Sequence, residues 1–274
     1  MEYTLHGFDA SKFQGVIDWG KAAKGQDFVL LRAGFGRLAS QEDPRFKANV
    51  KGAYDAGMRQ IGVYWYSYAA DAADAEREAA ACIAVLEPCR EKITLPVFFD
   101  QEYEPAILAA GKEARSAACQ AFIRAVQKAG YRAGMYGSLD WLTNKIKPEL
   151  LPEGTVIWCA RYGSAQPGIG HTVWQYTSEG KIDGISGKVD LNRAGDGLII
   201  KPRWEKTPEG WKYGGFANRW GWINGNWYWF DENGIAVTGW RKVDGVWYYF
   251  LTQTDAEMTG MKECACMAVL DKEK

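Results

Sequence analysis

The chain has 274 residues, 47% of them hydrophobic and 24% charged, which is the composition of a folded protein with a sizeable core. Because 33 basic residues nearly balance 34 acidic ones, a partner held mainly by phosphate neutralisation is disfavoured, and we expect no nucleic-acid partner. No apolar run is long enough to span a bilayer, and the first residues lack the basic and apolar regions of a secretory signal. We therefore expect no membrane partner and no signal peptide in this chain.

Short apolar segments alternate with helical segments through the first 200 residues. Strands are predicted at 5–9, 28–34, 61–66, 95–100, 131–136, 156–160, 172–176 and 188–191. Helices are predicted at 43–57, 71–86 and 112–130, with Gly57 and Gly130 as C-terminal stops of the first and the last. Strands and helices in alternation predict a parallel sheet.

The connections after residue 137 are shorter and carry less helical pattern than the earlier ones. Eight strands within about 200 residues therefore favour a closed barrel from which some helices are missing. An open doubly wound sheet is the alternative. It would need a glycine-rich phosphate loop after the first strand, and residues 9–15 do not form one.

Four acidic residues stand at the ends of predicted strands. Asp100 and Glu102 close the fourth strand and share one face of it, because side chains alternate along a strand. Asp9 ends the first strand, and Asp190 lies in the last strand, which closure of a barrel would place beside the first. Since catalytic groups of parallel barrels lie at the C-terminal ends of the strands, we expect the four carboxylates around one opening.

Such a group of acids suits glycoside hydrolysis, in which one carboxylic acid protonates the leaving oxygen while an anionic partner stabilises the transition state. Neighbouring negative charges raise one pKa and so supply a protonated acid near neutral pH. Two other interpretations are open. The acids could cap helices or pair with basic side chains, or their oxygens could hold a metal, although no nearby histidine supports that.

Aromatic side chains at the same strand ends fit a sugar ligand, because the C–H faces of pyranose rings pack on flat aromatic rings. Tyr64 and Tyr66 share one face of the third strand, and Trp174 and Tyr176 share one face of the seventh. These four are the predicted substrate contacts, with ordinary core packing as the alternative for each.

The six cysteines show no disulfide framework in their spacing. Cys264 and Cys266 could indicate metal or redox chemistry, but the chain has only two histidines and no second cysteine pair with ligand spacing. We expect no metal and no organic cofactor.

A series of motifs in the first 197 residues resembles glycoside hydrolase family 25, the Chalaropsis-type lysozymes. The motifs are Gly7–Ser11, Gln14–Gly15, Asp18–Trp19, Phe28–Gly34, Gly62–Tyr66, Phe99–Glu102, Ile157–Tyr162, Trp174–Tyr176, Gly184–Gly187 and Val189–Asp190. The resemblance implies an irregular TIM-like (β/α)5(β)3 barrel that hydrolyses the β-1,4 bond between N-acetylmuramic acid and N-acetylglucosamine in bacterial peptidoglycan.

The same resemblance implies the roles of the acids. Glu102 is the general acid and then base, Asp100 is its companion, and Asp9 and Asp190 complete the pocket. Asp100 either attacks the sugar or positions the substrate's acetamido group as nucleophile, and we favour assistance by the substrate. One departure from the family is Trp65, where many relatives carry histidine.

The amino-acid composition of the chain changes near residue 200. Eight of its thirteen tryptophans lie in the last 74 residues, and Trp204, Trp222 and Trp240 recur every 18 residues. A second tryptophan follows each, and the turn sequences Asn224–Gly225 and Asp244–Gly245 precede short aromatic blocks. This pattern predicts a small all-β module of repeated hairpins over 201–274, after a catalytic domain over 1–200.

The repeats resemble choline-binding repeats of cell-wall proteins. Choline is a quaternary ammonium ion, held by the negative faces of aromatic rings. By the family's plan, one cage would consist of Trp204, Trp211 and Trp229, and another of Trp222, Trp227 and Tyr249. The ligand is choline or another cell-wall component, and a third cage at Trp240 and Trp247 would be incomplete.

Together these features predict a cell-wall muramidase that acts outside the cell and is anchored by its repeats. A wall-binding protein with an inactive barrel and a hydrolase of another acetylated glycan, such as chitin, are the alternatives. The absence of a leader suits a phage endolysin, but a bacterial enzyme without its leader would have the same sequence.

Overall fold

The computed structural model describes residues 2–199, 204–214, 216–223, 225–252, 254–255, 258 and 266. The chain divides into two compact units, Met1–Ile199 and Ile200–Lys274, and each is described by itself. No helix in the described ranges is both long and apolar enough to cross a membrane.

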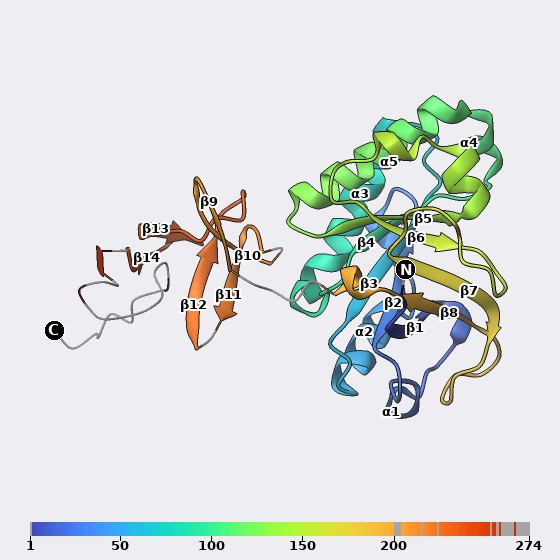
Figure 1. Cartoon of the computed structure of the whole chain (residues 1–274), viewed down its shortest axis with the longest axis horizontal. Coiled ribbons are helices and arrows are strands. Elements are labelled where there is room, and N and C mark those ends of the chain that lie inside the picture. The colour runs from blue at the N-terminus through green and yellow to red at the C-terminus, as the bar shows by residue number, and fades with distance from the viewer. Residues whose placement is uncertain are drawn as a thin grey trace. The chain divides into compact units, whose positions relative to one another are not determined.

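The first unit is a closed barrel of eight strands that follow one another in chain order (Figure 1). The strands are β1 (Leu5–Ala10), β2 (Phe28–Phe35), β3 (Ile61–Tyr66), β4 (Val97–Asp100), β5 (Ala133–Ser138), β6 (Val156–Ala160), β7 (Val173–Gly180) and β8 (Val189–Ala194). The prediction of a barrel is confirmed. Strands β1 to β7 run parallel, whereas β8 is antiparallel to both neighbours, β7 and β1. The connection 181–188 is too short for a parallel crossover, which explains the reversal.

Helices cover the outside of the barrel after the first five strands. They are α1 (Trp19–Ala22), α2 (Phe46–Asp55), α3 (Ala72–Leu86), α4 (Pro105–Ala109), α5 (Gly111–Lys128) and, after β5, the π-helical turn Trp141–Lys145. Short 3-10 turns lie at Lys12–Gln14, Ala39–Gln41, Glu87–Lys92, Pro148–Leu150 and Asp196–Leu198. The described connections after β6 and β7 contain no helix, so the pattern is (β/α)5(β)3. The three predicted helices are present, and α1 and α4 are too short to show a periodicity.

Two layers of buried side chains hold the barrel together. Inward-facing aromatic rings fill its interior: Trp158 of β6 contacts Tyr64, Phe98 and Tyr136, with ring centroids 5.8, 5.2 and 4.5 Å away. Outward-facing side chains pack under the helices, as where Phe99 stacks on Phe122 of α5. Because Asp100 follows Phe98 by two positions, it continues the inward face at the C-terminal end of β4.

Trp65 lies on the outer face of β3, where it is completely buried and its Nε1 donates to the Gly36 carbonyl oxygen at 2.9 Å. The ring occupies the space beside Gly34 on β2. The departure from the family's histidine therefore lies outside the barrel interior.

Substitution of Gly34 by alanine should destabilise the barrel. The added Cβ would lie 2.6 Å from the Trp65 ring and 2.7 Å from the Gln41 carbonyl oxygen, and neither group can move freely. Such overpacking typically costs about 1–3 kcal/mol, so the melting temperature of Gly34→Ala should fall by several degrees. Gly170→Ala is the control, because a Cβ there meets nothing within 4 Å. Equal melting temperatures for the two variants would contradict the packing at Trp65.

The described residues of the second unit form three β-hairpins, as the repeats predict (Figure 1). Their strands are β9 (Trp204–Thr207) with β10 (Gly210–Tyr213), β11 (Arg219–Ile223) with β12 (Asn226–Phe230), and β13 (Gly239–Val243) with β14 (Val246–Phe250). Asp244 and Gly245 both have positive φ, which the tight turn of the third hairpin requires. Asn224 of the second turn lies outside the described residues.

Candidate active site

The four predicted acids lie at one pocket at the C-terminal ends of the parallel strands. The pocket encloses about 250 Å³ and is lined by Asp9, Asp100, Glu102 and Asp190, together with polar and aromatic side chains. Asp9 and Asp190 are directly opposite one another in the β1–β8 ladder, because β8 closes the barrel against β1. We call this space the acid pocket.

Two amide side chains hold Asp9 in a fixed orientation. Its Oδ2 accepts hydrogen bonds from Gln175 Nε2 of β7 at 2.9 Å and from Asn192 Nδ2 of β8 at 2.8 Å. All three side chains are buried. With Oδ2 engaged twice, Oδ1 is the oxygen left for Asp190 and for a ligand.

Each of these amides is oriented by further donors. The hydroxyl groups of Tyr136 and Tyr162 donate to Gln175 Oε1 at 3.0 and 3.2 Å, and Trp158 Nε1 donates to Asn192 Oδ1 at 2.8 Å. Since the carbonyl oxygen of each amide receives a proton donor, its NH2 group must face Asp9. The network extends from the barrel interior to Tyr162 at the mouth of the pocket.

Burial is the main influence on the four acids. It raises the pKa of Asp9 and Asp100 well above the ordinary range and raises the pKa of Glu102 and Asp190 as well. Neighbouring carboxylates add to the effect: Asp190 raises the pKa of Asp9, and Glu102 raises that of Asp100. The cluster therefore retains protons at a pH where exposed carboxylic acids are ionised, which is the condition for a general acid.

One of the two predicted aromatic pairs lines the acid pocket. Tyr64 and Tyr66 of β3 do so, and the Tyr66 hydroxyl donates to Glu104 Oε1 at 2.7 Å. Trp174 and Tyr176 do not line it: they lie on the other face of β7, where Trp174 Nε1 donates to the Arg161 carbonyl oxygen. The residue of β7 that faces the acid pocket is Gln175, and contact of Trp174 and Tyr176 with the substrate stays a prediction.

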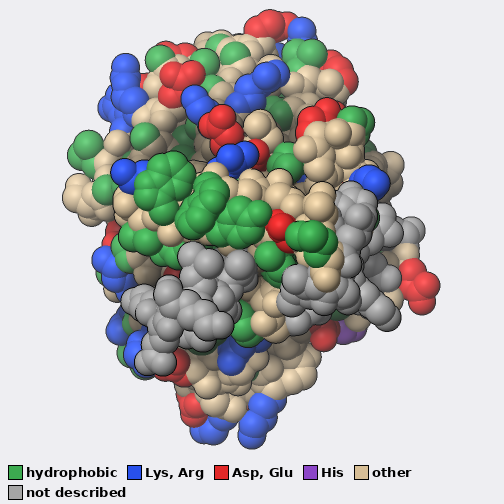
Figure 2. All heavy atoms as spheres, turned by 90° about the vertical axis from the view of Figure 1, so that its left-hand side faces the viewer, with side chains coloured by type: hydrophobic (Ala, Val, Ile, Leu, Met, Phe, Trp, Pro, Cys, Tyr) green, Lys and Arg blue, Asp and Glu red, His purple; other side chains and the backbone are tan. Residues whose placement is uncertain are grey.

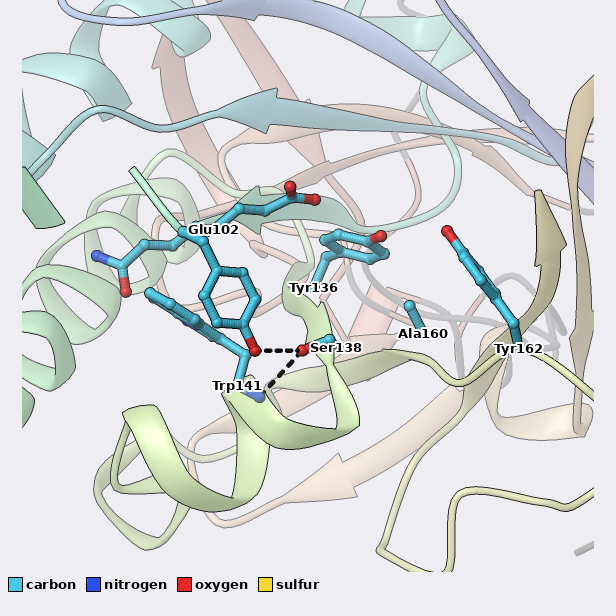
Figure 3. A pocket seen from close by; sticks show the side chains of 8 residues that line it. Glu102, Tyr136, Ser138, Trp141, Ala160 and Tyr162 are labelled. Atoms are coloured by element: carbon cyan, nitrogen blue, oxygen red, sulfur yellow. Dashed lines mark hydrogen bonds between the residues drawn. The ribbon is translucent and has the colours of Figure 1, made fainter. Parts of the chain in front are cut away.

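A second pocket of about 240 Å³ adjoins the acid pocket (Figure 3). Glu102, Tyr136 and Tyr162 line both, so the two are parts of one cleft with Glu102 at their boundary. In Figure 3, Glu102 and Tyr162 stand on either side, with Tyr136 and Ala160 between them. A carboxyl group between two adjoining pockets can reach a bond that joins two units of a bound chain.

The far wall of this second pocket is held by hydrogen bonds. The Tyr103 hydroxyl bonds to Ser138 Oγ at 3.1 Å and donates to Asp140 Oδ2 at 2.8 Å, and the Trp141 backbone N–H donates to the same Ser138 oxygen at 3.1 Å. The Tyr103 and Trp141 rings meet edge to face. Aromatic and hydroxyl groups together suit a sugar.

Sequence reasoning missed several residues of the cleft: Arg32, Trp158, Tyr162, Gln175 and Asn192. Arg32 carried a signal, since it is a charged residue inside an otherwise apolar strand. Gln175 lies within the motif Trp174–Tyr176 but is neither acidic nor aromatic, and Asn192 lies two residues beyond the motif Val189–Asp190.

The described part of the chain contains no group of three or more His, Cys, Asp or Glu side chains arranged to hold a metal ion. Cys82, Cys119 and Cys159 are buried, and burial raises the pKa of each thiol. Cys266 is buried in the second unit, and Cys264 lies outside the described residues.

The first predicted choline cage is not formed as the repeats imply. Trp204 packs in the core of the second unit against Tyr213 and Tyr228, with ring centroids 5.0 and 4.8 Å away, and Trp229 packs against Trp220. Trp211 also packs against this core. Trp204 of the first hairpin is thus partly buried against the core of the unit.

The second predicted cage is formed in part. Trp222 and Trp227 face one another across β11 and β12, with ring centroids 5.2 Å apart and with 59% and 42% of their surface exposed. The third member, Tyr249, lies against Trp240, and its hydroxyl donates to Asp255 Oδ2 at 2.7 Å. The second hairpin therefore carries an exposed aromatic pair, and the third pairs the exposed Trp240 with the half-buried Tyr249.

Comparison with known protein families gives a separate match for each of the two units. The model of glycosyl hydrolases family 25 matches residues 8–185, which is more than half of the chain. The chain belongs to glycosyl hydrolases family 25. A model of the choline-binding repeat matches residues 217–260.

Relatives of this family 25 glycosidase include lysozyme M1 of Streptomyces globisporus, which is 25% identical over 69% of this chain and 67% of its own length. Among solved structures, the catalytic domain of endolysin ply40 from Listeria monocytogenes bacteriophage P40 is 26% identical with a TM-score of 0.63, over 72% of this chain and 96% of that one. The modular autolysin LytC of Streptococcus pneumoniae is 25% identical with a TM-score of 0.60, over 69% of this chain. The chain matches 46% of the autolysin's length.

The amide network predicts an effect on the pH profile of the glycosidase. The hydrogen bonds from Gln175 and Asn192 lower the pKa of Asp9 against the effect of burial. Gln175→Met removes one of them, so the pKa of Asp9 should rise further and the acidic limb of the kcat profile should move to higher pH. We expect kcat to fall about tenfold, the scale of one hydrogen bond to a charged group. Gln127→Met, which changes an exposed amide on α5, is the control. An unchanged acidic limb would show that Gln175 does not act through Asp9.

Proposed function

We propose that the chain is an N-acetylmuramidase that hydrolyses the β-1,4 bond between N-acetylmuramic acid and N-acetylglucosamine in bacterial peptidoglycan. The observation that carries the proposal is the position of Glu102, a half-buried acid at the boundary of two adjoining pockets in a family 25 barrel. Similarity to lysozyme M1 and to an autolysin that has been crystallised with a synthetic peptidoglycan ligand supports the choice of substrate.

In this mechanism Glu102 protonates the glycosidic oxygen. Burial raises its pKa, which favours the protonated form that a general acid requires. Positive charge then develops on the sugar in the acid pocket, where it is opposed by the carboxylate form of Asp9, which the hydrogen bonds from Gln175 and Asn192 favour. After the leaving sugar departs, the Glu102 carboxylate accepts a proton from the attacking water.

The proximity of Asp100 to Glu102 favours assistance by the substrate. Both carboxyl groups line the acid pocket, and each shifts the pKa of the other. Enzymes that attack the sugar with a carboxylate keep it about 5–5.5 Å from the acid, whereas Asp100 and Glu102 are only two residues apart at the end of β4. Asp100 instead orients the acetamido group of the substrate, whose oxygen attacks the anomeric carbon.

The decisive experiment is digestion of purified peptidoglycan and of chitin, followed by identification of the new reducing ends. Release of N-acetylmuramic acid ends from peptidoglycan, with little turnover of chitin, is expected. Release of N-acetylglucosamine ends would assign a different bond, and no turnover of either polymer would support a wall-binding protein with an inactive barrel.

We propose that residues 201–274 anchor the catalytic unit, residues 1–200, to the cell wall, where the enzyme acts from outside the cell. Exposed aromatic side chains support this: Trp222, Trp227, Trp240 and Trp247 all have more than two fifths of their surface exposed. Figure 2 shows hydrophobic side chains gathered side by side on one face. Aromatic rings in such an arrangement suit choline or a glycan.

Retention of the full chain on a choline-type resin, and its elution by free choline, tests the ligand. Trp222→Ala should weaken retention, because it removes one ring of the exposed pair, while Val246→Ala, which truncates another exposed residue of the unit, should not. Failure of the unaltered chain to bind would favour a glycan ligand over choline.

A further inference from the structure

Arg32 on β2 is the one lysine or arginine among the residues that line the acid pocket. Its Nε lies 2.7 Å from Asp43 Oδ2, and both side chains are nearly or completely buried. The ring of Phe13, which is 75% exposed at the mouth of the pocket, lies over the guanidinium with its centroid 5.0 Å away.

Asp43 holds this arginine in place rather than only neutralising it. Its Oδ2 also accepts the backbone N–H of Lys12 at 3.1 Å, and its Oδ1 accepts that of Arg45 at 2.9 Å. Among the described residues, Asp43 is the one acceptor that bonds to the Arg32 guanidinium, and it engages Nε alone. The two terminal nitrogens of a residue that lines the pocket remain for a ligand.

The position of Arg32 places it beside the sugar that occupies the acid pocket. The identity of that sugar rests on the function proposed above. Arg32 lines the acid pocket and not the second pocket beyond Glu102. In a muramidase the sugar whose anomeric carbon becomes cationic is N-acetylmuramic acid, and the pocket with the acids is where that sugar belongs. This sugar carries its acetamido group on C2 and a lactyl ether on C3, one carbon farther from the broken bond.

We propose that Arg32 binds the free carboxyl group of the lactyl ether in N-acetylmuramic acid units that carry no peptide, and so distinguishes these units from chitin. A carboxylate entering a pocket of four acids requires a fixed cation to offset the repulsion. A guanidinium with two free nitrogens matches the two oxygens of a carboxylate. Chitin has a hydroxyl group at this position and gains nothing from the charge.

The test compares two forms of one substrate. Peptide-free glycan strands with free lactyl carboxylates are assayed beside the same strands with these groups converted to methyl esters. The unaltered enzyme should cut the carboxylate form with a kcat/KM about 10- to 100-fold higher, the scale of a charge-assisted pair. In Arg32→Gln this ratio should fall towards one, mainly through KM. Arg32→Lys, which keeps the charge and loses the fork, should give an intermediate ratio.

The ratio of kcat/KM for the carboxylate and methyl ester strands separates recognition of the carboxylate from other roles of Arg32. Its charge also lowers the pKa of Asp100, so Arg32→Gln should shift the pH profile, but that shift acts equally on both substrates. Arg37→Gln is the control, because Arg37 pairs with Asp74 on the surface and does not line the pocket.

A ratio near one in the unaltered enzyme, or a ratio that Arg32→Gln leaves unchanged, would overturn the proposal. The first measurement needs no variant, so it decides the question even if Arg32→Gln does not fold. An enzyme that cuts neither form of the strand would refute the muramidase assignment itself, which is a separate outcome.

Discussion

Glu102→Gln should fold normally and lose turnover of peptidoglycan by about 10²- to 10⁴-fold, the range that a positioned general acid contributes. The amide has nearly the same shape as the acid but cannot give a proton to the glycosidic oxygen. Because the amide keeps the shape of the side chain where the two pockets meet, the substitution should leave binding of glycan strands largely intact. The loss should therefore be in kcat.

The matched control is Glu149→Gln, which makes the same chemical change at an exposed residue of the turn Pro148–Leu150. Release of reducing ends is measured for both variants, with melting temperatures to confirm folding. Ordinary turnover by Glu102→Gln would mean that another group supplies the proton, and the assignment of the acid would fail.

Asp100→Asn should lower activity strongly and, near neutral pH, raise stability. Asp100 is buried, and one of its carboxyl oxygens has no hydrogen-bond partner among the described residues. Burial and Glu102 raise its folded pKa, so it contributes stability below its unfolded pKa and loses that contribution as the pH rises through the folded value. The neutral amide carries no charge that must be buried at neutral pH. The melting temperature of Asp100→Asn should therefore exceed that of the unaltered enzyme at pH 7, and the difference should shrink towards pH 4.

Asp18→Asn gives the opposite sign and serves as the control. Hydrogen bonding to Lys21 lowers the folded pKa of this exposed carboxyl, so its contribution is present above its unfolded pKa and is lost as the pH falls. If Asp100→Asn melts below the unaltered enzyme at neutral pH, then Asp100 stabilises the fold. The conclusion that burial and Glu102 disfavour its ionised form would be wrong.

The sequence sufficed for the barrel because its strands and helices are locally encoded. Strands such as β2 and β3 are continuous apolar runs, and α3 and α5 are long enough to show a helical period. The direction of β8 was not encoded in this way. It depends on the length of a loop and on closure against β1, which are properties of the whole barrel.

The cleft shows a similar division. Acids at strand ends can be found from the alternation of side chains alone, as for Asp100 and Glu102. On β7 the same alternation leaves two choices of face, and the sequence does not say which face lines the acid pocket. Gln175, and not the aromatic pair, faces inward to meet Asp9. The partners of Arg32 could not be predicted either, since Asp43 reaches it from another segment of the chain.

In the second unit, the period of the repeats predicts hairpins but not which tryptophans stay at the surface. Trp204 and Trp222 occupy equivalent positions in the repeat, yet Trp204 packs in the core and Trp222 is exposed. The choice depends on how many neighbouring rings fill each core, which a single repeat does not specify.

The most direct test of the account is a crystal structure of Glu102→Gln with a peptide-free muramyl glycan bound. The account predicts an N-acetylmuramic acid ring in the acid pocket beside Asp9, Asp100 and Asp190, with its glycosidic oxygen within hydrogen-bonding distance of the side chain at position 102. A glycan bound away from these carboxylates, or one whose glycosidic oxygens all lie beyond reach of position 102, would contradict it.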